Sequence, residues 1–566
     1  MQAPWLAHYD PGVPRAIGTY PEKTLVDFVA EHARTRPHAV AATFKKTRLS
    51  FARLDELSDA LAAALARDGL GKGDRVGLVL PNAPQFLIAE CAAWKLGAII
   101  APQNPLYTER ELEDSFARSR PEIVITLTPF YERVKEVQAK LGLRRVVATS
   151  IKEYLPPLLR VLFTWLKERR EGHRITLRAG DAWLQSLIEQ GRSLPRPQRV
   201  ATPSDPAVIL MSGGTTGTPK GVLSDHRGLV QSGTQLLAWL QEPLQGKNAS
   251  IMLPLPLFHT YGCAGAQSMT LLAGIPLMLV PNPRDVGDLL KTIAFEKPAL
   301  LCGVPALFNA ILNHPRVARG KVDLRSINGC FSGASALLVE TKKRFESLTG
   351  GRIVEGYSLT EATMACCANP FGGQTKLGSI GMPLCDVKVK IVDSEHGTKQ
   401  LGCGEVGEIM LSAPQLMKQY WDDPGETALV LESADDGPWL HTGDLAYMDE
   451  DGYLFIVDRK KDLIKTSGFQ VWPREIEEVI AKHPAVAEVG VAGVPDERQG
   501  EAINAWVVLR AGARVTQDEL RALCRESLAP FKVPRRIHFR AELPKTMVGK
   551  ILRRVLVEEA VKGTKT

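Results

Sequence analysis

Short apolar runs alternate with amphipathic segments along residues 76–126. The apolar or β-rich runs are 76–80, 98–101 and 123–126, and the segments with helical periodicity between them are 85–96 and 109–118. Such alternation predicts a mostly parallel β-sheet flanked by helices, because parallel strands are joined by crossover helices. The same rhythm returns around 251–280 and 300–350, so this part of the chain indicates an α/β fold.

The pattern changes after Lys388. Strand-like runs at 387–392, 407–411 and 452–457 indicate a smaller, partly antiparallel region. The charged run 458–462 then precedes a segment with its own order of helix, strand, strand and helix, at 473–483, 489–491, 505–508 and 518–528. Because polar linkers join units with separate cores, we expect one domain at 1–460 and a second at 461–566.

Composition places the chain among ordinary soluble globular proteins. Of its 566 residues, 45% are apolar and 23% charged, and a net charge of +7 is too small to suggest a nucleic-acid-binding protein. Nine cysteines without CxxC spacing favour reduced thiols and a cytoplasmic location. The N-terminus lacks the pattern of a signal peptide, and no apolar run approaches the roughly 20 residues that cross a bilayer.

The segment 154–174 combines an apolar run with a basic flank. Lys167, Arg169, Arg170 and Arg174 follow the apolar residues 154–166. Two interpretations stay open: a helix that lies on an anionic membrane surface, and a helix that packs against its own protein.

The strongest local signal is a loop rich in glycine and hydroxyl side chains. It reads Ser212-Gly213-Gly214-Thr215-Thr216-Gly217-Thr218-Pro219-Lys220-Gly221 and directly follows an apolar run at 207–211. Glycines leave backbone N–H groups free to face phosphate oxygens, the threonines add donors, and Lys220 adds positive charge. Pro219 stands where a Walker A loop has glycine, so we expect a phosphate-binding loop of another kind.

A second glycine pattern, 402–407, matches the dinucleotide fingerprint G-x-G-x-x-G. That fingerprint requires a strand before it and a helix after it, whereas a strand-like run follows Gly407. We therefore reject dinucleotide binding.

Four further motifs follow in order. They are Glu355-Gly356-Tyr357-Ser358-Leu359-Thr360-Glu361, Trp439-Leu440-His441-Thr442-Gly443-Asp444, Asp458-Arg459 and Pro544-Lys545-Thr546-Met547-Val548-Gly549-Lys550. Together with the glycine-rich loop they resemble the adenylate-forming superfamily of acyl-CoA synthetases, peptide-synthetase adenylation domains and beetle luciferases. The runs 255–259, 458–462, 467–473 and 548–554 look most like those of bacterial long-chain fatty acid CoA ligases.

The resemblance extends from about residue 25 to residue 560. It implies an α/β fold: a large N-terminal domain of parallel-type sheets plus a small barrel-like subdomain, hinged to a small α+β C-terminal domain. It also implies a two-step reaction. A fatty acid carboxylate attacks the α-phosphate of MgATP to give acyl-AMP and pyrophosphate, and the thiol of coenzyme A then displaces AMP.

Site residues are carried over from the same resemblance. The implied ATP-binding residues are Ser212, Gly213, Gly214, Thr215, Thr216, Gly217, Lys220, Gly333, Ala334, Gly356, Tyr357, Thr360, Asp444, Arg459 and Lys550. The implied catalytic residues are Thr360, Lys465 and Lys550, with Glu361 as the Mg²⁺ ligand and Lys461 as the hinge. Ser467, Gly468 and Phe469 are implied for coenzyme A, and His259, Tyr261 and Gly303 for the acyl pocket.

Individual roles follow from this similarity. The 212–221 loop is expected to hold the β- and γ-phosphates, Tyr357 to stack on adenine, and Thr360 to contact the α-phosphate. Asp444, helped by Arg459, is expected to accept hydrogen bonds from the ribose hydroxyls. Lys550 is expected to bridge the acyl carboxylate and the α-phosphate in the first step.

Several alternatives remain at this stage. A CoA ligase for medium-chain or other carboxylic acids, a luciferase-like oxygenase, a carrier-loading adenylation module and an inactive acyl or nucleotide binder are the competing functions. The intact set of Lys550, Glu361, Asp444 and Arg459 argues against an inactive binder. His259 is either a pocket residue or a core histidine, Ser358 replaces a glycine common in the family, and a homodimer is left open.

Overall fold

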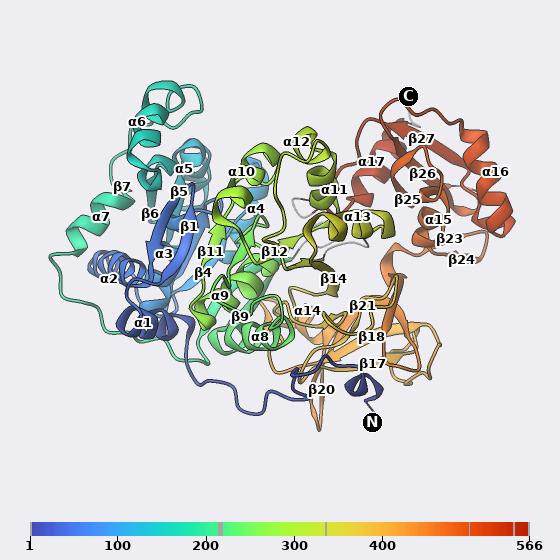
Figure 1. The fold of residues 1–566 in the computed structure, drawn as a ribbon, viewed down its shortest axis with the longest axis horizontal. Coiled ribbons are helices and arrows are strands. Elements are labelled where there is room, and N and C mark those ends of the chain that lie inside the picture. Colours follow the sequence, from blue (N-terminus) through green and yellow to red (C-terminus); the bar gives the residue numbers. More distant parts are fainter. Residues whose placement is uncertain (1–2, 213–218, 334–336, 497, 547–548, 564–566) are drawn as a thin grey trace.

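The computed structural model describes residues 3–212, 219–333, 337–496, 498–546 and 549–563. Within these residues the strands form four sheets, three before Lys460 and one after it (Figure 1). The two largest sheets are mostly parallel and lie side by side with helices around them, as the alternation of strands and helices predicts.

The first sheet has nine strands among the described residues, in the order β16-β15-β14-β13-β12-β10-β11-β1-β2. Their bounds are β1 Val40–Phe44, β2 Thr47–Ser50, β10 Ile251–Leu253, β11 Leu277–Leu279, β12 Leu300–Gly303, β13 Gly329–Ser332, β14 Arg352–Tyr357, β15 Cys367–Ala368 and β16 Met382–Pro383. From β14 across to β1 all neighbours are parallel, and the edge strands β2, β15 and β16 pair antiparallel.

The second sheet has the order β19-β9-β8-β4-β3-β5-β6-β7. Its strands are β3 Arg75–Val79, β4 Ile99–Pro102, β5 Ile123–Leu127, β6 Arg145–Thr149, β7 Ala182–Trp183, β8 Pro206–Ser212, β9 Lys220–Asp225 and β19 Gln419–Tyr420. The pairs from β8 to β7 are parallel, while β9 pairs antiparallel with both β8 and β19. Strand β19 reaches this sheet from far along the chain.

The helices of the N-terminal part connect and cover these sheets. They are α1 Leu25–Thr35, α2 Phe51–Arg67, α3 Pro84–Lys95, α4 Glu109–Ser119, α5 Tyr131–Leu141, α6 Pro157–Leu166, α7 Leu184–Gly191, α8 His226–Trp239, α9 Ser268–Ala273, α10 Val286–Glu296, α11 Pro305–Asn313, α12 Pro315–Ala318 and α13 Val339–Thr349, with a π-helix at Tyr261–Gln267. Helix α3 is buried along its whole length.

The third sheet is antiparallel and occupies the position of the expected barrel-like subdomain. It contains β17 Lys388–Val392, β18 Gly407–Ser412, β20 Leu431–Ala434, β21 Gly437–Met448 and β22 Leu454–Arg459, with α14 Pro424–Val430 before β20. Gly407 begins β18 rather than a helix, which supports the rejection of dinucleotide binding.

The C-terminal part is a separate α+β unit at one end of the molecule (Figure 1). It contains β23 Ile464–Thr466, β24 Phe469–Val471, β25 Val486–Asp496, β26 Gly500–Leu509, β27 Arg536–Arg540, α15 Pro473–Ala481, α16 Gln517–Ser527 and α17 Arg553–Gly563. Its apolar clusters begin at Ile464, whereas the main core ends at Leu454. A 3₁₀ turn at Lys460–Asp462 connects the two parts, and the boundary at 460/461 stays a prediction.

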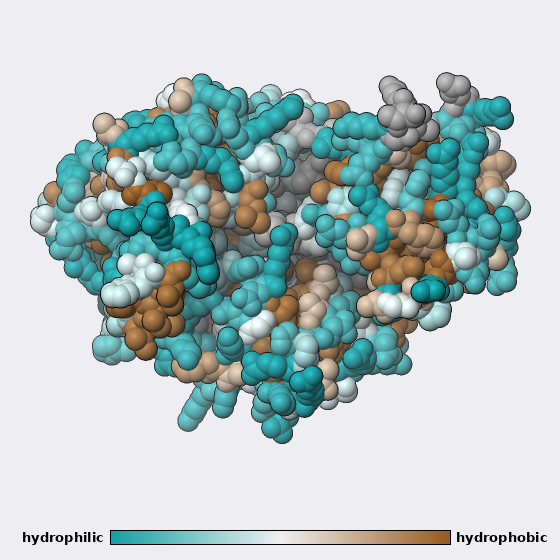
Figure 2. Space-filling model, turned by 90° about the horizontal axis from the view of Figure 1, so that it is seen from above, coloured by the Kyte–Doolittle hydropathy of each residue, from teal (hydrophilic) through white to brown (hydrophobic). Residues whose placement is uncertain are grey.

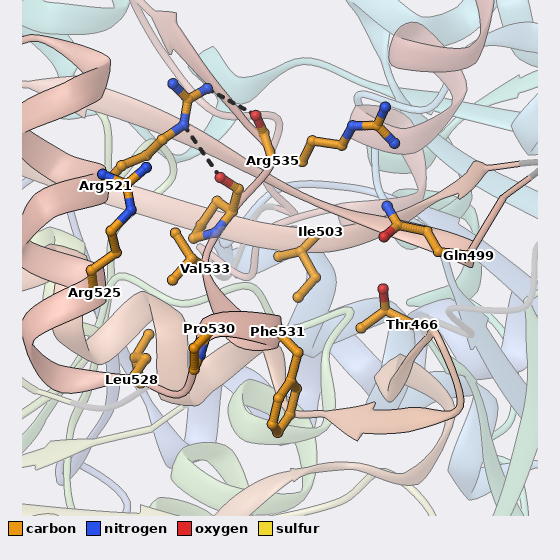
Figure 3. Close-up of a pocket in the computed structure, with 11 residues that line it drawn as sticks. Thr466, Gln499, Ile503, Arg521, Arg525, Leu528, Pro530, Phe531, Val533 and Arg535 are labelled. Atoms are coloured by element: carbon orange, nitrogen blue, oxygen red, sulfur yellow. Dashed lines mark hydrogen bonds between the residues drawn. The ribbon is translucent and has the colours of Figure 1, made fainter.

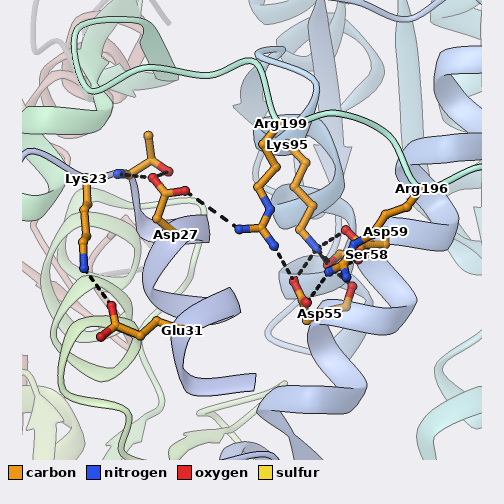
Figure 4. A network of polar contacts seen from close by, with 10 residues as sticks. Lys23, Asp27, Glu31, Asp55, Ser58, Asp59, Lys95, Arg196 and Arg199 are labelled. Carbon is orange, nitrogen blue, oxygen red and sulfur yellow. Dashed lines mark hydrogen bonds and ion pairs between the residues drawn. The ribbon is translucent and has the colours of Figure 1, made fainter. Parts of the chain in front are cut away.

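A buried charge network joins α3 to α2 (Figure 4). The Lys95 side chain is completely buried, and its Nζ donates to the Asp55 and Asp59 carboxylates, each at 2.7 Å, and to Ser58 Oγ at 2.8 Å. Although burial opposes it, Lys95 holds the pKa of Asp55 below its ordinary value. Arg196 also pairs with both carboxylates, so the network connects the chain before β8 to α2 as well.

None of the helices in the described residues combines the length and the apolar character that crossing a bilayer requires.

Candidate active site

The described site residues gather at the carboxyl ends of parallel strands. Ser212 ends β8, Gly303 ends β12, Gly333 follows β13 and Tyr357 ends β14. In open α/β sheets, ligands bind in the crevice outside these strand ends. Gly213, Gly214, Thr215, Thr216, Gly217 and Ala334 lie outside the described residues.

Tyr357, Asp444 and Arg459 form one hydrogen-bonded group. The Tyr357 hydroxyl donates to Asp444 Oδ2 at 2.6 Å, and Arg459 Nε donates to Asp444 Oδ1 at 3.0 Å. Asp444 and Arg459 are direct cross-strand partners in β21 and β22. Burial, and then the Asp444 charge, raise the pKa of Tyr357 well above its ordinary value, so the phenol stays neutral. Each carboxylate oxygen retains a second lone pair for a ligand hydroxyl.

Lys550 lies close to this group although it belongs to the C-terminal part. Its loop is closed by two bonds to Thr546, from Thr546 N to Lys550 O at 2.8 Å and from Lys550 N to Thr546 Oγ1 at 3.1 Å. A Cβ added to Gly549 would lie 4.0 Å from side-chain atoms of Val304 and Ala306, so the loop contacts the start of α11. Burial and, second, the Arg459 charge lower the pKa of Lys550 to about 8, while the Asp444 charge opposes them.

Glu361 and Lys220 belong to a second polar group. Tyr420 OH donates to Glu361 Oε1 at 2.9 Å, and Lys220 Nζ lies 4.8 Å from the centre of the Tyr420 ring. Lys220 also pairs with Glu426 at 2.5 Å. Thr360 lies in the turn after β14, directly before Glu361. This group connects the strand after the glycine-rich loop to the carboxylate expected to bind Mg²⁺.

Tyr420 and Glu426 are site residues that the sequence did not indicate. They reach Lys220 because β19 pairs with β9, with Gln419 opposite Leu223 and Tyr420 opposite Val222. A two-residue strand leaves no periodic pattern to detect.

The predicted acyl-pocket residues also lie together. The Tyr261 hydroxyl donates to Phe331 O at 2.6 Å, and a Cβ added to Gly333 would lie 3.3 Å from the Tyr261 ring. Gly333 N donates to Gly303 O at 3.3 Å. His259 Nδ1 accepts from Tyr261 N at 3.2 Å, and burial lowers the pKa of His259 to about 4, so its ring is neutral. Tyr261 begins the π-helix, a feature common at functional sites.

Gly356 has a packing role in addition to its expected place beside ATP. A Cβ at this position would lie 2.3 Å from Phe331 Cζ, so only glycine fits there without moving the ring.

The segment predicted for coenzyme A lies elsewhere, on the C-terminal part. Ser467 and Gly468 both have positive φ, +50° and +83°, and form the two-residue turn between β23 and β24. Within the described residues, no hydrogen bond or ion pair joins 465–469 to Tyr357, Asp444 or Lys550. Among the described residues, Lys550 thus lies close enough to Asp444 and Arg459 for their charges to influence its pKa, while Lys465, Ser467, Gly468 and Phe469 make no polar contact with that group.

A basic cavity of about 730 Å³ opens beside this turn (Figure 3). The Phe469 ring stacks on Phe531 with centroids 4.3 Å apart. Phe531 also lines the cavity, together with Arg521, Arg525 and Arg535. Three guanidinium groups and an exposed aromatic face suit an anionic ligand that carries a flat ring.

The expected hinge residue, Lys461, is exposed in the middle of the 3₁₀ turn. Arg474 connects the two parts: its N donates to Asp458 Oδ2 at 2.9 Å and its Nη1 to Ile456 O at 3.0 Å. Within the C-terminal part, Arg553 pairs with Asp462 at 2.8 Å.

Two protein-family models match the chain. The model described as "AMP-binding enzyme" matches residues 29–421, and the one described as "AMP-binding enzyme C-terminal domain" matches residues 475–550. The chain belongs to the AMP-binding enzyme family. The long-chain-fatty-acid–CoA ligase of Bacillus subtilis is 39% identical over 561 residues, with 99% of this chain and 98% of the relative covered. The ligase of the same name from Salmonella typhimurium is 35% identical, with 99% of both chains covered.

Among solved structures, ATP-bound MatB from Rhodopseudomonas palustris matches with a TM-score of 0.80 and 28% identity, over 94% of this chain and 98% of that one. These matches confirm the predicted superfamily and fold class of this AMP-binding enzyme. The individual residue roles stay predictions.

Proposed function

We propose that this AMP-binding enzyme is a long-chain fatty acid CoA ligase, which forms acyl-CoA, AMP and pyrophosphate from a fatty acid, ATP and coenzyme A. The proposal rests on Lys550, which a loop of the C-terminal part holds beside the Tyr357–Asp444–Arg459 group. Full-length similarity to two ligases named for long-chain fatty acids supports the substrate class.

In the first step, Asp444 accepts hydrogen bonds from the ribose, and Lys220 adds positive charge where the β- and γ-phosphates bind. The Lys550 ammonium stabilises the charge that develops between the attacking carboxylate and the α-phosphate. Catalysis of this kind consists mainly of positioning and charge stabilisation. Asp444 is bonded to Tyr357 and Arg459, and Lys550 lies close enough to Asp444 and Arg459 for their charges to influence its pKa.

Glu361 is the proposed Mg²⁺ ligand. Its Oε1 accepts from Tyr420, while no hydrogen bond or ion pair within the described residues involves Oε2. One carboxylate oxygen suits Mg²⁺, which is usually held by one or two carboxylates and the substrate phosphates. When bound, the ion would neutralise phosphate charge.

In the second step, coenzyme A needs access to the same carbonyl, so the C-terminal part has to rotate about Lys461. Rotation would bring Lys465 and the Ser467–Gly468 turn to the site, with the backbone around Gly468 near the thiol. The basic cavity with Arg521, Arg525 and Arg535 is a proposed site for the phosphates of coenzyme A.

The test is to incubate the purified protein with ATP, Mg²⁺, coenzyme A and either palmitic or octanoic acid. We expect AMP and thioester in equal amounts, with palmitic acid preferred by kcat/KM. Preference for octanoic acid would support the medium-chain alternative. Acyl-AMP without thioester, or light emission with oxygen, would contradict the proposal.

Peripheral membrane contact through 154–174 belongs to the same proposal. The segment forms α6, of which only Phe163 is buried within the described residues, while Trp165 is 84% exposed. Packing of α6 against its own protein therefore explains the burial of Phe163 but not the apolar character of the other, exposed side chains of this helix. Arg169→Glu/Arg170→Glu should weaken binding to vesicles that contain anionic phospholipid and leave octanoic acid turnover unchanged. Unaltered vesicle binding would contradict the proposed membrane contact.

A homodimer and a cytoplasmic location are predictions that sedimentation and cell fractionation would test.

A further inference from the structure

Helix α6 lies at the end of the N-terminal part away from the C-terminal unit (Figure 1), and its side chains line a second cavity. We call it the α6 groove. Its volume is about 700 Å³, within the range of small-molecule sites. Leu159, Leu162 and Leu166 line it from α6, and the opposite wall is also mostly apolar. Figure 2 shows apolar side chains at the surface of this end of the molecule.

The groove lies on the same edge of the two large sheets as the candidate active site. Phe44 ends β1, Leu127 ends β5, Pro254 follows β10 and Val280 follows β11, and all four residues line the groove. In the nine-stranded sheet, the ends of β14, β13 and β12 carry site residues, and β10, β11 and β1 come next in order. Site and groove are therefore neighbours along one row of strand ends, where α/β folds bind ligands.

One short loop is shared by both regions. Pro254, Pro256 and Phe258 line the groove, and His259 follows directly in the candidate acyl pocket. Asn82 fixes this loop, because its Nδ2 donates to Leu255 O at 2.7 Å and its Oδ1 accepts from Leu257 N at 2.8 Å. The loop, held by Asn82, thus lines the groove and leads directly to His259 of the candidate acyl pocket.

Charged side chains lie at the rim of the groove. Among the described lining residues the cations are Lys45, Lys167 and Arg284, and the single carboxylate is Glu171. Lys45 pairs with Asp288 at 2.5 Å and Lys167 with Glu171 at 3.4 Å, but an ammonium has three donors and can contact a second anion. The groove therefore combines an apolar floor with a rim that carries ion-paired ammonium groups.

We propose that the α6 groove binds the alkyl chain of the long-chain fatty acid before its carboxylate reaches the site beside His259. This inference rests on the proposed function, and it assigns a receiving site for the substrate that is separate from the nucleotide site. Helix α6 forms the outer wall, and Phe163, in edge contact with His173 at 4.9 Å, anchors it.

Binding to an apolar groove should depend steeply on chain length. Each methylene transferred from water contributes about 0.8 kcal/mol, which corresponds to roughly a fourfold gain in affinity. Palmitic acid should therefore bind far more tightly than octanoic acid in the absence of ATP and coenzyme A.

The first experiment locates the chain directly. The full-length protein, without nucleotides, is irradiated with a palmitic acid analogue that carries a diazirine at its methyl end, and the labelled peptides are identified. We expect label on 155–166, 254–258 or 280–284, displaced by unlabelled palmitic acid. Label confined to other peptides would overturn the proposal.

The second experiment uses a matched pair on α6. Leu162→Glu changes a lining residue that is 44% exposed, and Val161→Glu changes the preceding residue, which is 55% exposed and does not line the groove. Leu162→Glu should raise KM for palmitic acid at least tenfold with little change in kcat or in octanoic acid turnover, and Val161→Glu should leave all of these unchanged. Leu162→Trp, which fills the groove without charge, should act like Leu162→Glu.

Failures of the two proposals are distinguishable. If the wild type is an active ligase and both α6 variants have the same KM for palmitic acid as the wild type, the groove proposal is wrong and the proposed function stands. If no acid is activated but the analogue labels the groove, the groove stands as a fatty acid site and the ligase function is wrong. Loss of a dimer in Leu162→Glu without labelling of the groove would identify a second copy as the occupant and overturn the proposal.

Discussion

Replacing Lys550 should abolish the first half-reaction and spare the second. Arg459 and Asp444 both influence the pKa of Lys550, so its ammonium is close to where the nucleotide is expected. A preorganised transition-state contact of this type contributes about 3 to 4 kcal/mol, which corresponds to 10² to 10³ in rate. Lys550→Ala should slow acyl-AMP formation by that factor.

The lowered pKa of Lys550 adds a pH dependence with a definite sign. The ammonium is the active form, and with a pKa of about 8 in the free enzyme it is lost as pH rises through 8. kcat/KM for acyl-AMP formation reports the free enzyme, so it should fall about tenfold per pH unit above that value. Bound ATP is negative and raises the pKa, so kcat should persist to higher pH. Lys550→Arg stays charged and should remove the fall, although its absolute rate is lower.

The assay separates the half-reactions. Pyrophosphate release is measured with fatty acid and ATP, and thioester formation is measured from supplied acyl-AMP and coenzyme A. Lys545→Ala is the matched control, because Lys545 lies in the same loop but pairs with Glu488 in the C-terminal part. Equal loss in both half-reactions, or a flat kcat/KM profile between pH 7 and 10, would refute the reasoning.

Three further predictions concern the hinge and the buried charges. Lys461→Pro fixes φ near −65°, a 3₁₀ value, so it should keep pyrophosphate release and lose thioester formation; normal transfer from acyl-AMP would exclude Lys461 as the hinge. Lys95→Met leaves Asp55 and Asp59 without their buried partner and should lower the free energy of unfolding in urea by about 3 to 5 kcal/mol, whereas a loss below about 1 kcal/mol would contradict the assigned network. Burial raises the pKa of Glu90 to about 8, so between pH 5 and 8 the folded protein holds a proton that the unfolded chain releases, and stability falls as pH rises. Glu90→Gln should flatten that slope by about 1.4 kcal/mol per pH unit, and an unchanged slope would mean that Glu90 is ionised in the fold.

Much of the fold follows from local pattern. The apolar runs at 76–80 and 123–126 became β3 and β5, and the helix predicted at 473–483 is α15. Family motifs identified Tyr357, Asp444, Arg459 and Lys550 as candidate site residues. Hydrophobic periodicity does not show that these four residues lie close together. The hydrogen bond from Tyr357 to Asp444 joins strands of two different sheets and depends on tertiary packing.

Burial was less predictable than secondary structure. Residues 85–96 have helical periodicity, which suggests a helix with one solvent-exposed face. Every side chain of α3 is nevertheless buried, including Glu90 and Lys95. Their partners, Gln267 and Asp55, are distant in sequence, so the sequence around Glu90 and Lys95 does not indicate that these side chains are buried. Helix α6 shows the opposite: an apolar sequence whose side chains are mostly exposed.

The proposed order of the two half-reactions is consistent with how the C-terminal part is built. Lys465 lies in β23, and Lys550 lies in the loop that ends at Ile551. The Ile551 side chain packs on β25, because it lies 3.3 Å from a Cβ placed at Gly490. Strands β23 and β25 both pair with β26, so the two lysines are carried by one sheet and its packed loop. A unit of this kind would move as a whole, and in the arrangement described Lys550 is the lysine near Asp444 and Arg459 that the proposed first step requires. On the proposed function, each step would exclude the other, because the movement that admits coenzyme A would also withdraw the Lys550 ammonium from the site of adenylation.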